Sequence, residues 1–157
     1  MRVRQGKKED LQSVHNLICE LADFEGSLNE VQITLNDLEK DGFGPTKFYD
    51  FLVAENKNKI IGLSFYWIRY STWKGKFLFL EDFVIKQEYR GQGVGSKLFE
   101  ATVKKCNELN LNGMTWQVLD WNTQAINFYR KYNSSISGEW LNGKLNKLQI
   151  KRILENI

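Results

Sequence analysis

The stretch YRGQGVGSKL, residues 89–98, decides the fold of this chain. It places glycines at three alternate positions, Gly91, Gly93 and Gly95, and an apolar-patterned segment begins at Val94. Glycines let backbone N–H groups approach a ligand closely, and the start of a helix carries a partial positive charge. The stretch therefore predicts a loop that binds a phosphate group or, as the alternative, a tight strand-to-helix turn without a ligand.

The glycine spacing excludes two familiar phosphate-binding loops. In a Walker loop the last glycine is adjacent to a lysine, whereas Ser96 separates Gly95 from Lys97 in this chain. The dinucleotide fingerprint reads G-x-G-x-x-G and follows the first strand of a βαβ unit. This loop reads G-x-G-x-G and follows a series of strand-like segments, so it belongs to a different class.

The segments around the loop predict a mixed α/β (α+β) fold. Residues 48–55, 59–70 and 76–85 are rich in β-branched and aromatic residues and are separated by turn-prone sequences, which is typical of an antiparallel meander. The other expected elements are an N-terminal strand, helices at 11–21, 34–42, 94–109 and 123–132, and strands at 114–119 and 147–154. We expect a central mixed, mostly antiparallel sheet of about six to seven strands flanked by about four helices. Thr34 is the expected N-cap of the second helix and Gly42 its terminator.

Composition limits the possible functions. The chain has 157 residues, 42% of them hydrophobic, and a net charge of +3 without a dense basic run, which argues against disorder and against a nucleic-acid partner. His15 is the one histidine, so a histidine metal site is not expected. No apolar run reaches the ~18 residues of a membrane span. Cys19 and Cys106, without a secretory signal, indicate reduced thiols in a soluble, cytoplasmic protein of one domain.

Two motifs resemble the GNAT acetyltransferases. RGQGVG, residues 90–95, matches their R/Q-x-x-G-x-G/A signature, whose loop holds the pyrophosphate of acetyl-CoA. FLFLEDFVIKQEYRGQGVGSKLF (77–99) and VLDWNTQAINFYRKY (118–132) are similar to segments of diamine and thialysine N-acetyltransferases. The resemblance implies one GNAT domain over residues 1–157, a homodimer, and acetyl transfer by direct attack of a small-molecule primary amine (a diamine, a polyamine or a thialysine-like amino acid). No metal is needed for such a reaction.

The expected reaction needs a base, because an alkyl ammonium has a pKa near 10 and is largely unreactive at neutral pH. Glu81 interrupts an apolar strand and is the candidate base, acting directly or through water; in a regular strand its neighbour Asp82 would point to the opposite face. The alternative is that both are strand-edge charges or salt-bridge partners. Tyr129 matches the tyrosine that lies beside the coenzyme sulfur in the resembled family. It is the candidate acid for the thiolate, or else a core aromatic that packs with Ile126.

The resemblance also assigns contacts with the coenzyme. In this family, strand backbone after the acidic pair, freed by a bulge, faces the acetyl group and the pantetheine arm. The implied set is Phe83, Val84, Ile85, Arg90, Gly91, Gln92, Gly93, Val94, Gly95, Ser96, Asn122, Ala125, Tyr129 and Lys131. Asn122 is equally well explained as a helix N-cap, and Lys131 as a solvated cation.

The acceptor is less constrained by the sequence. Phe24, Glu25, Glu81, Trp116 and Gln117 are the candidate acceptor-binding residues, because acidic and aromatic side chains together attract a cationic amine. The aromatic run FYWIRYSTW, residues 65–73, is a further candidate for the amine pocket, although strand aromatics such as Tyr66 and Trp67 are more often core residues. Ser71-Thr72 stands where diamine acetyltransferases tend to carry an acidic residue, which weakens the case for a polyamine. Alternatives are acetylation of a protein or peptide amine, a non-catalytic acyl-CoA sensor, and a nucleotide-phosphate-binding module.

Overall fold

The computed structural model describes residues 1–155. Its main elements are β1 (Arg2–Gln5), α1 (Leu11–Phe24), α2 (Leu35–Phe43), β2 (Asp50–Asn56), β3 (Lys59–Ser71), β4 (Gly75–Ile85), α3 (Val94–Glu108), β5 (Met114–Trp116), α4 (Thr123–Arg130) and α5 (Lys147–Leu154). Single 3-10 turns occur at Lys8–Asp10, Leu28–Glu30 and Gln87–Tyr89. The chain packs as two compact units, Met1–Gln117 and the part from Val118 onwards, and each is described separately. That the whole chain acts as one domain stays a prediction.

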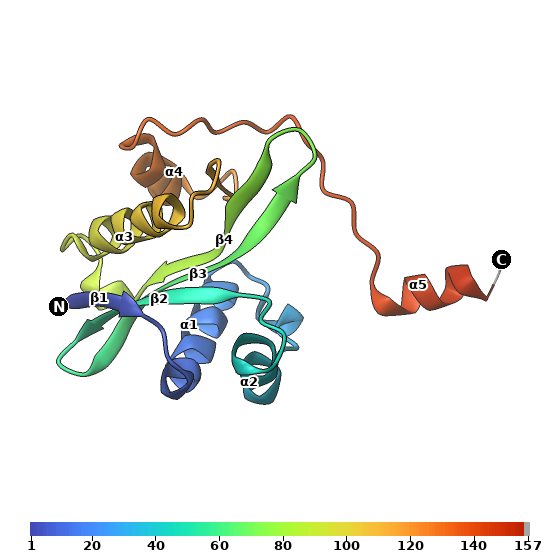
Figure 1. Cartoon of the computed structure of the whole chain (residues 1–157), viewed down its shortest axis with the longest axis horizontal. Coiled ribbons are helices and arrows are strands. Elements are labelled where there is room, and N and C mark those ends of the chain that lie inside the picture. Colours follow the sequence, from blue (N-terminus) through green and yellow to red (C-terminus); the bar gives the residue numbers. More distant parts are fainter. Residues whose placement is uncertain (156–157) are drawn as a thin grey trace. The chain divides into compact units, whose positions relative to one another are not determined.

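The first unit contains a five-stranded sheet in the order β1-β2-β3-β4-β5. The first four strands pair antiparallel, and β5 pairs parallel with β4. In Figure 1, α1 and α2 lie on one face of this sheet and α3 on the other. The mixed, mostly antiparallel sheet is confirmed. The expected counts are not: residues 1–155 contain five strands and five α-helices instead of six to seven strands and about four helices.

The difference in count comes from residues 147–154, which form the helix α5 and not the predicted strand. Asn146 caps this helix: its side-chain Oδ1 accepts from the Gln149 N–H at 2.9 Å, and Gln149 Oε1 accepts from the Asn146 N–H at 2.8 Å. Ile150, Ile153 and Leu154 follow with the helical spacing of three and one. The strand prediction rested on a short apolar alternation that this capping box outweighs.

The helix α2 begins as expected but ends later. Thr34 is its N-cap, and the Thr34 hydroxyl accepts from the Asp37 N–H at 3.2 Å. Gly42 does not terminate the helix, which continues one residue further and has its C-cap at Gly44. Gly42 is glycine because the ring of Tyr49 occupies the space that a Cβ would need. The glycine therefore serves close packing and not helix termination.

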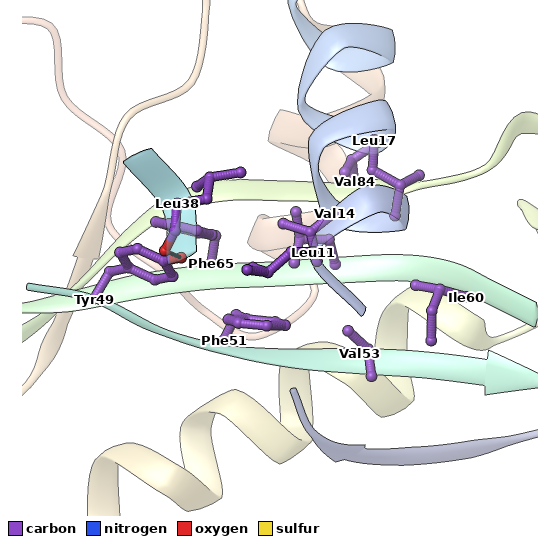
Figure 2. Close-up of a cluster of buried hydrophobic side chains, with 11 residues drawn as sticks. Leu11, Val14, Leu17, Leu38, Tyr49, Phe51, Val53, Ile60, Phe65 and Val84 are labelled. Atoms are coloured by element: carbon purple, nitrogen blue, oxygen red, sulfur yellow. Dashed lines mark hydrogen bonds between the residues drawn. The ribbon is translucent and has the colours of Figure 1, made fainter. Parts of the chain in front are cut away.

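The two faces of the sheet bury different sets of side chains. Figure 2 shows the cluster between the sheet and the helices α1 and α2. Its members are Leu11, Val14, Leu17, Leu38, Tyr49, Phe51, Val53, Ile60, Leu63, Phe65 and Val84. On the other side, Ser64 Oγ lies 2.7 Å from Thr102 Oγ1 of α3. Because successive strand residues alternate, the odd-numbered β3 residues from Leu63 onward lie on the α1 face and the even-numbered ones on the α3 face.

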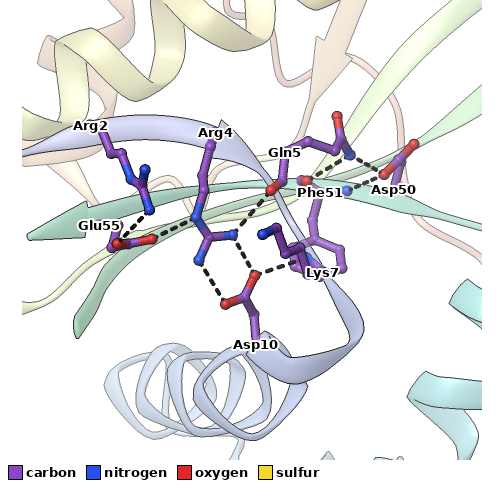
Figure 3. Close-up of polar contacts among 8 residues, drawn as sticks. All are labelled: Arg2, Arg4, Gln5, Lys7, Asp10, Asp50, Phe51 and Glu55. Atoms are coloured by element: carbon purple, nitrogen blue, oxygen red, sulfur yellow. Dashed lines mark hydrogen bonds and ion pairs between the residues drawn. The ribbon is translucent and has the colours of Figure 1, made fainter. Parts of the chain in front are cut away.

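An ion-pair network fixes α1 to the sheet edge (Figure 3). Arg4 on β1 donates to both Asp10 oxygens at 2.7 and 2.9 Å and to Glu55 on β2 at 2.5 Å. Burial alone would raise the pKa of Asp10, but the hydrogen bonds from Arg4 and from the Lys7 N–H hold that pKa below its usual value. The network thus orients the start of the helix whose other end reaches the site described below.

Cys19 and Cys106 are both free thiols. Among residues 1–155, no helix combines the length and the apolar character needed to cross a membrane.

Candidate active site

A β-bulge in β4 brings two acidic side chains to one face of the sheet. Phe65 lies opposite Asp82, whereas the next residue, Tyr66, lies opposite Leu80, so Glu81 is an extra residue in β4. Cross-strand partners share a face, and one extra residue shifts the alternation by one. Asp82 therefore lies on the α1 face with Phe65. The expectation that Asp82 points away from Glu81 assumed a regular strand, and the bulge overturns it.

A tryptophan holds Glu81 on this face. Trp67 Nε1 donates to Glu81 Oε2 at 2.8 Å, and the Trp67 ring lies 5.3 Å from the Phe79 ring, centre to centre. Glu81 is solvent-exposed, and Oε1 has no hydrogen-bond partner within the described residues. The indole thus fixes one oxygen of the carboxylate and leaves the other oxygen accessible to a ligand.

Asp82 is more enclosed than Glu81. Its burial, and then the negative charges of Glu81 and Glu25, raise its pKa to about 6. Glu25 follows the last residue of α1, and burial raises its pKa as well. The end of α1 therefore brings a third carboxylate to the acidic pair of β4. Asp82 is largely ionised at pH 7 and has the basicity that suits proton transfer near neutrality.

An arginine links this acidic cluster to the glycine loop. The Arg90 guanidinium carbon lies 5.7 Å from the centre of the Phe24 ring, at the end of α1, and Arg90 Nε donates to the Ile85 carbonyl at 2.9 Å. Gln92 Nε2 donates to the Glu88 carbonyl at 2.8 Å and fixes the loop internally. The structure thus brings together the predicted acceptor residues of α1, the acidic pair and the predicted coenzyme loop.

The glycine loop has the geometry of an anion-binding site. Gly91 and Gly93 have φ angles of 72° and 78°, a region that residues with a Cβ rarely adopt, and a Cβ added at either would meet nothing within 4 Å. Gly93 is the N-cap of α3, a helix of 15 residues. The backbone N–H groups of residues 94–96 belong to the first turn of this helix, where they have no intrahelical acceptor. Open space in front of these groups fits a phosphate.

Beside the loop, β4 separates from β5. Their pairing ends at Leu80 opposite Trp116, and β4 runs on to Ile85 with no strand of the described sheet along that edge. An extended ligand can therefore lie against this part of the backbone. The side chains are ordinary packing groups: Phe83 lies edge-on to Phe99 of α3, ring centres 5.9 Å apart, and Val84 is in the α1-face core. The resemblance implied a bulge after the acidic pair Glu81–Asp82. The bulge in β4 instead lies within that pair.

The structure does not bring every predicted acceptor residue together. Trp116 lies edge-on to Phe99, with ring centres 5.8 Å apart, and thus on the α3 face of the sheet. Gln117 is exposed just after it. Glu25 and Glu81 lie on the α1 face, so the sheet separates Trp116 from them.

The second unit contains the remaining predicted coenzyme residues. Asn122 is the N-cap of α4, and its Oδ1 accepts from the Ala125 N–H at 3.1 Å. The alternative explanation of Asn122 as a helix cap is therefore confirmed. Tyr129 is buried, 5% exposed, and burial raises its pKa. Its phenol is therefore protonated throughout the neutral range. Lys131 is exposed at the end of the helix.

Two residues of this site have a role that the sequence did not predict. Trp67, within the aromatic run considered for the amine pocket, was expected mainly in the core, and Asp82 was expected on the other face of a regular strand. The strand period alone places Trp67 on the face of Phe65, but only the bulge places the two acids beside it. The acidic pair in LFLED marks the position, but the sequence of β4 alone carries no signal for the bulge, which is defined by the pairing with β3.

The sequence model of the acetyltransferase (GNAT) family matches residues 14–133. The chain belongs to this family. It is thus an acyltransferase, and members of the family use acetyl-CoA as cosubstrate. A thialysine N-epsilon-acetyltransferase of Bos taurus is 38% identical over 82% of this chain and 80% of its own length. An L-ornithine N5-acetyltransferase of Arabidopsis thaliana is 29% identical over 71% of this chain and 46% of that protein.

Solved structures show the same fold. An aminoglycoside acetyltransferase from an uncultured soil metagenomic sample superposes with a TM-score of 0.76, covers 92% of this chain and 95% of its own, and shares 18% of its residues. A possible acetyltransferase from Clostridium difficile superposes with a TM-score of 0.73 at 20% identity, over 92% and 97% of the two chains. At these identities the likeness concerns the fold.

Proposed function

We propose that this chain transfers the acetyl group of acetyl-CoA to the primary amine of a small molecule, a diamine, polyamine or thialysine-like amino acid, by direct attack. One observation carries the proposal: the bulge sets Glu81 and Asp82 on one face, beside Glu25. The Arg90–Phe24 contact joins this face to the glycine loop. A cationic amine is attracted to the carboxylates and loses a proton to them.

The coenzyme is assigned to the glycine loop and the free edge of β4. The N–H groups of residues 94–96 and the positive end of α3 would hold its pyrophosphate, with Gly91 and Gly93 leaving the space open. The backbone of β4 beyond Leu80 would hold the extended arm. When bound, acetyl-CoA supplies a thioester carbonyl as the acetyl donor.

The acidic pair removes the proton from the attacking ammonium. Trp67 orients Glu81 toward the amine, so Glu81 binds it and accepts the proton directly or through water. Asp82 is a suitable base near neutrality, because burial and neighbouring charges raise its pKa to about 6. Glu25 adds attraction for the cation.

Tyr129 is assigned to the departing sulfur. Its raised pKa keeps the phenol protonated, so it donates a hydrogen bond as negative charge develops there. A phenol is a weaker acid than a thiol, so complete proton transfer from Tyr129 is uphill. We therefore assign the O–H group to charge stabilisation during transfer, with final protonation of the thiolate from solvent. This assignment rests on the family motif and on the burial of Tyr129.

We further propose that the protein is a homodimer, as the family resemblance suggests. From the composition of the chain we propose that it is cytoplasmic and has no metal, nucleic-acid or membrane partner. Light scattering coupled to size-exclusion chromatography tests the dimer. A monomeric mass at micromolar concentration contradicts it.

The deciding experiment measures thiol release from acetyl-CoA with a panel of diamines, lysine analogues, aminoglycosides and lysine peptides. We expect turnover with a small primary amine, and a loss of at least 100-fold in kcat/KM when both Glu81→Gln and Asp82→Asn are present. Turnover with peptides alone would shift the acceptor to a protein amine. Coenzyme binding without turnover of any amine would contradict the proposed reaction.

A further inference from the structure

The face that carries Glu81 also carries an arginine that the proposed reaction does not use. Arg69 lies on β3 two residues beyond Trp67, so both side chains leave the same face of the sheet. Its guanidinium carbon is 5.8 Å from the centre of the Phe79 ring. Arg69 is exposed, and it has no ion-pair partner among residues 1–155. An exposed guanidinium held over a ring, without an ion-pair partner among residues 1–155, leaves its N–H groups accessible to a ligand.

Aromatic rings connect Arg69 to the acidic pair. Phe79, under the guanidinium, lies opposite Trp67, and the two ring centres are 5.3 Å apart. Trp67 in turn donates to Glu81 at 2.8 Å. We call these four residues, Trp67, Arg69, Phe79 and Glu81, the aromatic platform. It is positive at the Arg69 end and negative at the Glu81 end, where Asp82 adds a second carboxylate.

We propose, on the basis of the proposed function, that Arg69 binds the α-carboxylate of the acceptor, which is therefore an α-amino acid with a primary amine at the end of its side chain. A guanidinium that stacks on a ring by its face keeps its N–H groups free at its edge. Those groups match the two oxygens of a carboxylate. The ring under Arg69 also limits the motion of the side chain, so less entropy is lost on binding.

The length of such an acceptor suits the platform. In ornithine or lysine five or six bonds of about 1.5 Å separate the carboxylate carbon from the terminal nitrogen, which gives roughly 6 to 8 Å when extended. Residues two apart on a strand, such as Phe79 and Glu81, are about 6.7 Å apart. A carboxylate held by Arg69 above Phe79 therefore places the terminal amine at the acidic pair, with the methylene chain over the rings.

The same geometry disfavours diamines. The second ammonium of a diamine would approach the positive charge of Arg69, and like charges repel. Ser71, the last residue of β3, and Thr72, in the turn that follows, offer hydroxyls and no carboxylate. The platform thus discriminates between an amino acid and the diamine of the same length, because Arg69 attracts the carboxylate of the former and repels the second ammonium of the latter.

The test compares acceptors that differ only in the carboxylate: L-ornithine, L-lysine and thialysine, each against its carboxamide, with putrescine and cadaverine added. The variant is Arg69→Gln. Lys76→Gln is the control, because Lys76 is an exposed cation of the same hairpin, paired with Tyr70 on the other face of the sheet. Arg69→Lys keeps the charge but loses the forked geometry.

We expect Arg69→Gln to lower kcat/KM for the amino acids by about 10- to 100-fold, mainly through KM, and to change the carboxamides less than threefold. Arg69→Lys should recover part of the loss, and Lys76→Gln should behave as wild type. Equal effects of Arg69→Gln on amino acids and carboxamides, or no effect on either, would overturn the assignment. Wild-type turnover of diamines in preference to amino acids would overturn it as well, with the proposed function intact. No turnover of any amine would overturn the proposed function itself.

Discussion

Trp67 and Glu81 are joined by a hydrogen bond of 2.8 Å between neighbouring strands, from the indole N–H to one carboxylate oxygen. The bond exists because β3 keeps its alternation while β4 is shifted by the bulge, so that Glu81 lies on the face of Trp67. A side chain expected mainly in the core therefore orients the candidate base.

Trp67→Phe tests this orientation. The phenyl ring keeps the contact with Phe79 but cannot donate a hydrogen bond, so Glu81 gains freedom. We expect kcat to fall roughly 10-fold, since positioning by one hydrogen bond contributes about 1 to 1.5 kcal/mol. Steady-state kinetics with acetyl-CoA at saturation measure it. An unchanged kcat would show that the indole N–H has no part in positioning Glu81.

Asp82→Asn tests the buried carboxylate through stability. Asp82 has a pKa of about 6 when folded, above its usual value, so the folded protein binds this proton more tightly than the unfolded chain does. The free energy of unfolding therefore decreases as the pH rises from about 4 to about 6. Asp82→Asn removes that penalty and should stabilise the protein by about 1 to 3 kcal/mol at pH 7, with no gain below pH 4.

Urea unfolding at pH 4 and pH 7 measures the effect, and Asp23→Asn, an exposed acid on α1, is the control. The stabilised variant should be a poorer enzyme. In the wild type, kcat/KM should rise with pH through an apparent pKa near 6, and this rise should be weaker in Asp82→Asn. A variant less stable than wild type at pH 7 would contradict the claim that the ionised form of Asp82 destabilises the folded protein.

Gly93→Ala tests the coenzyme loop. A Cβ at Gly93 meets nothing within 4 Å, so the fold is kept, while its φ of 78° costs about 1 kcal/mol. The new methyl group enters the space in front of α3. We expect the Kd for coenzyme A to rise at least 10-fold in calorimetry.

Gly26→Ala is the matched control for Gly93→Ala. Gly26 has a φ of 71° and the same open surroundings, so the backbone strain is similar, but it lies outside the glycine loop. Its Kd for coenzyme A should stay as in wild type. Equal weakening in both variants would point to general strain and away from a phosphate site.

Tyr129→Phe tests the role at the sulfur. Tyr129 is buried, and phenylalanine keeps the ring, so the effect on packing is small. Loss of the O–H donor should lower kcat by about 10- to 100-fold and leave the KM for acetyl-CoA nearly unchanged, as expected for an interaction that strengthens during the reaction. A rise in KM with kcat retained would instead indicate a ground-state contact.

The sequence by itself determined the parts that depend on local chemistry. Gly91 and Gly93 permit the left-handed backbone that precedes α3, and the Thr34–Asp37 pair begins α2, because both effects act within one turn of the chain. The same local logic would have found α5, since Asn146 and Gln149 form a capping box. In residues 147–154 the alternation of apolar and polar side chains was too short to predict a strand.

Only the tertiary structure decided which side chains share the site. Whether Asp82 faces Glu81 or turns away depends on a single extra residue in β4, and that residue is defined by the pairing with β3 and not by β4 alone. Glu25, which raises the pKa of Asp82, lies 57 positions before it in the sequence. Strand alternation is a local property, but the register between strands and the burial of a charge arise from contacts between distant segments.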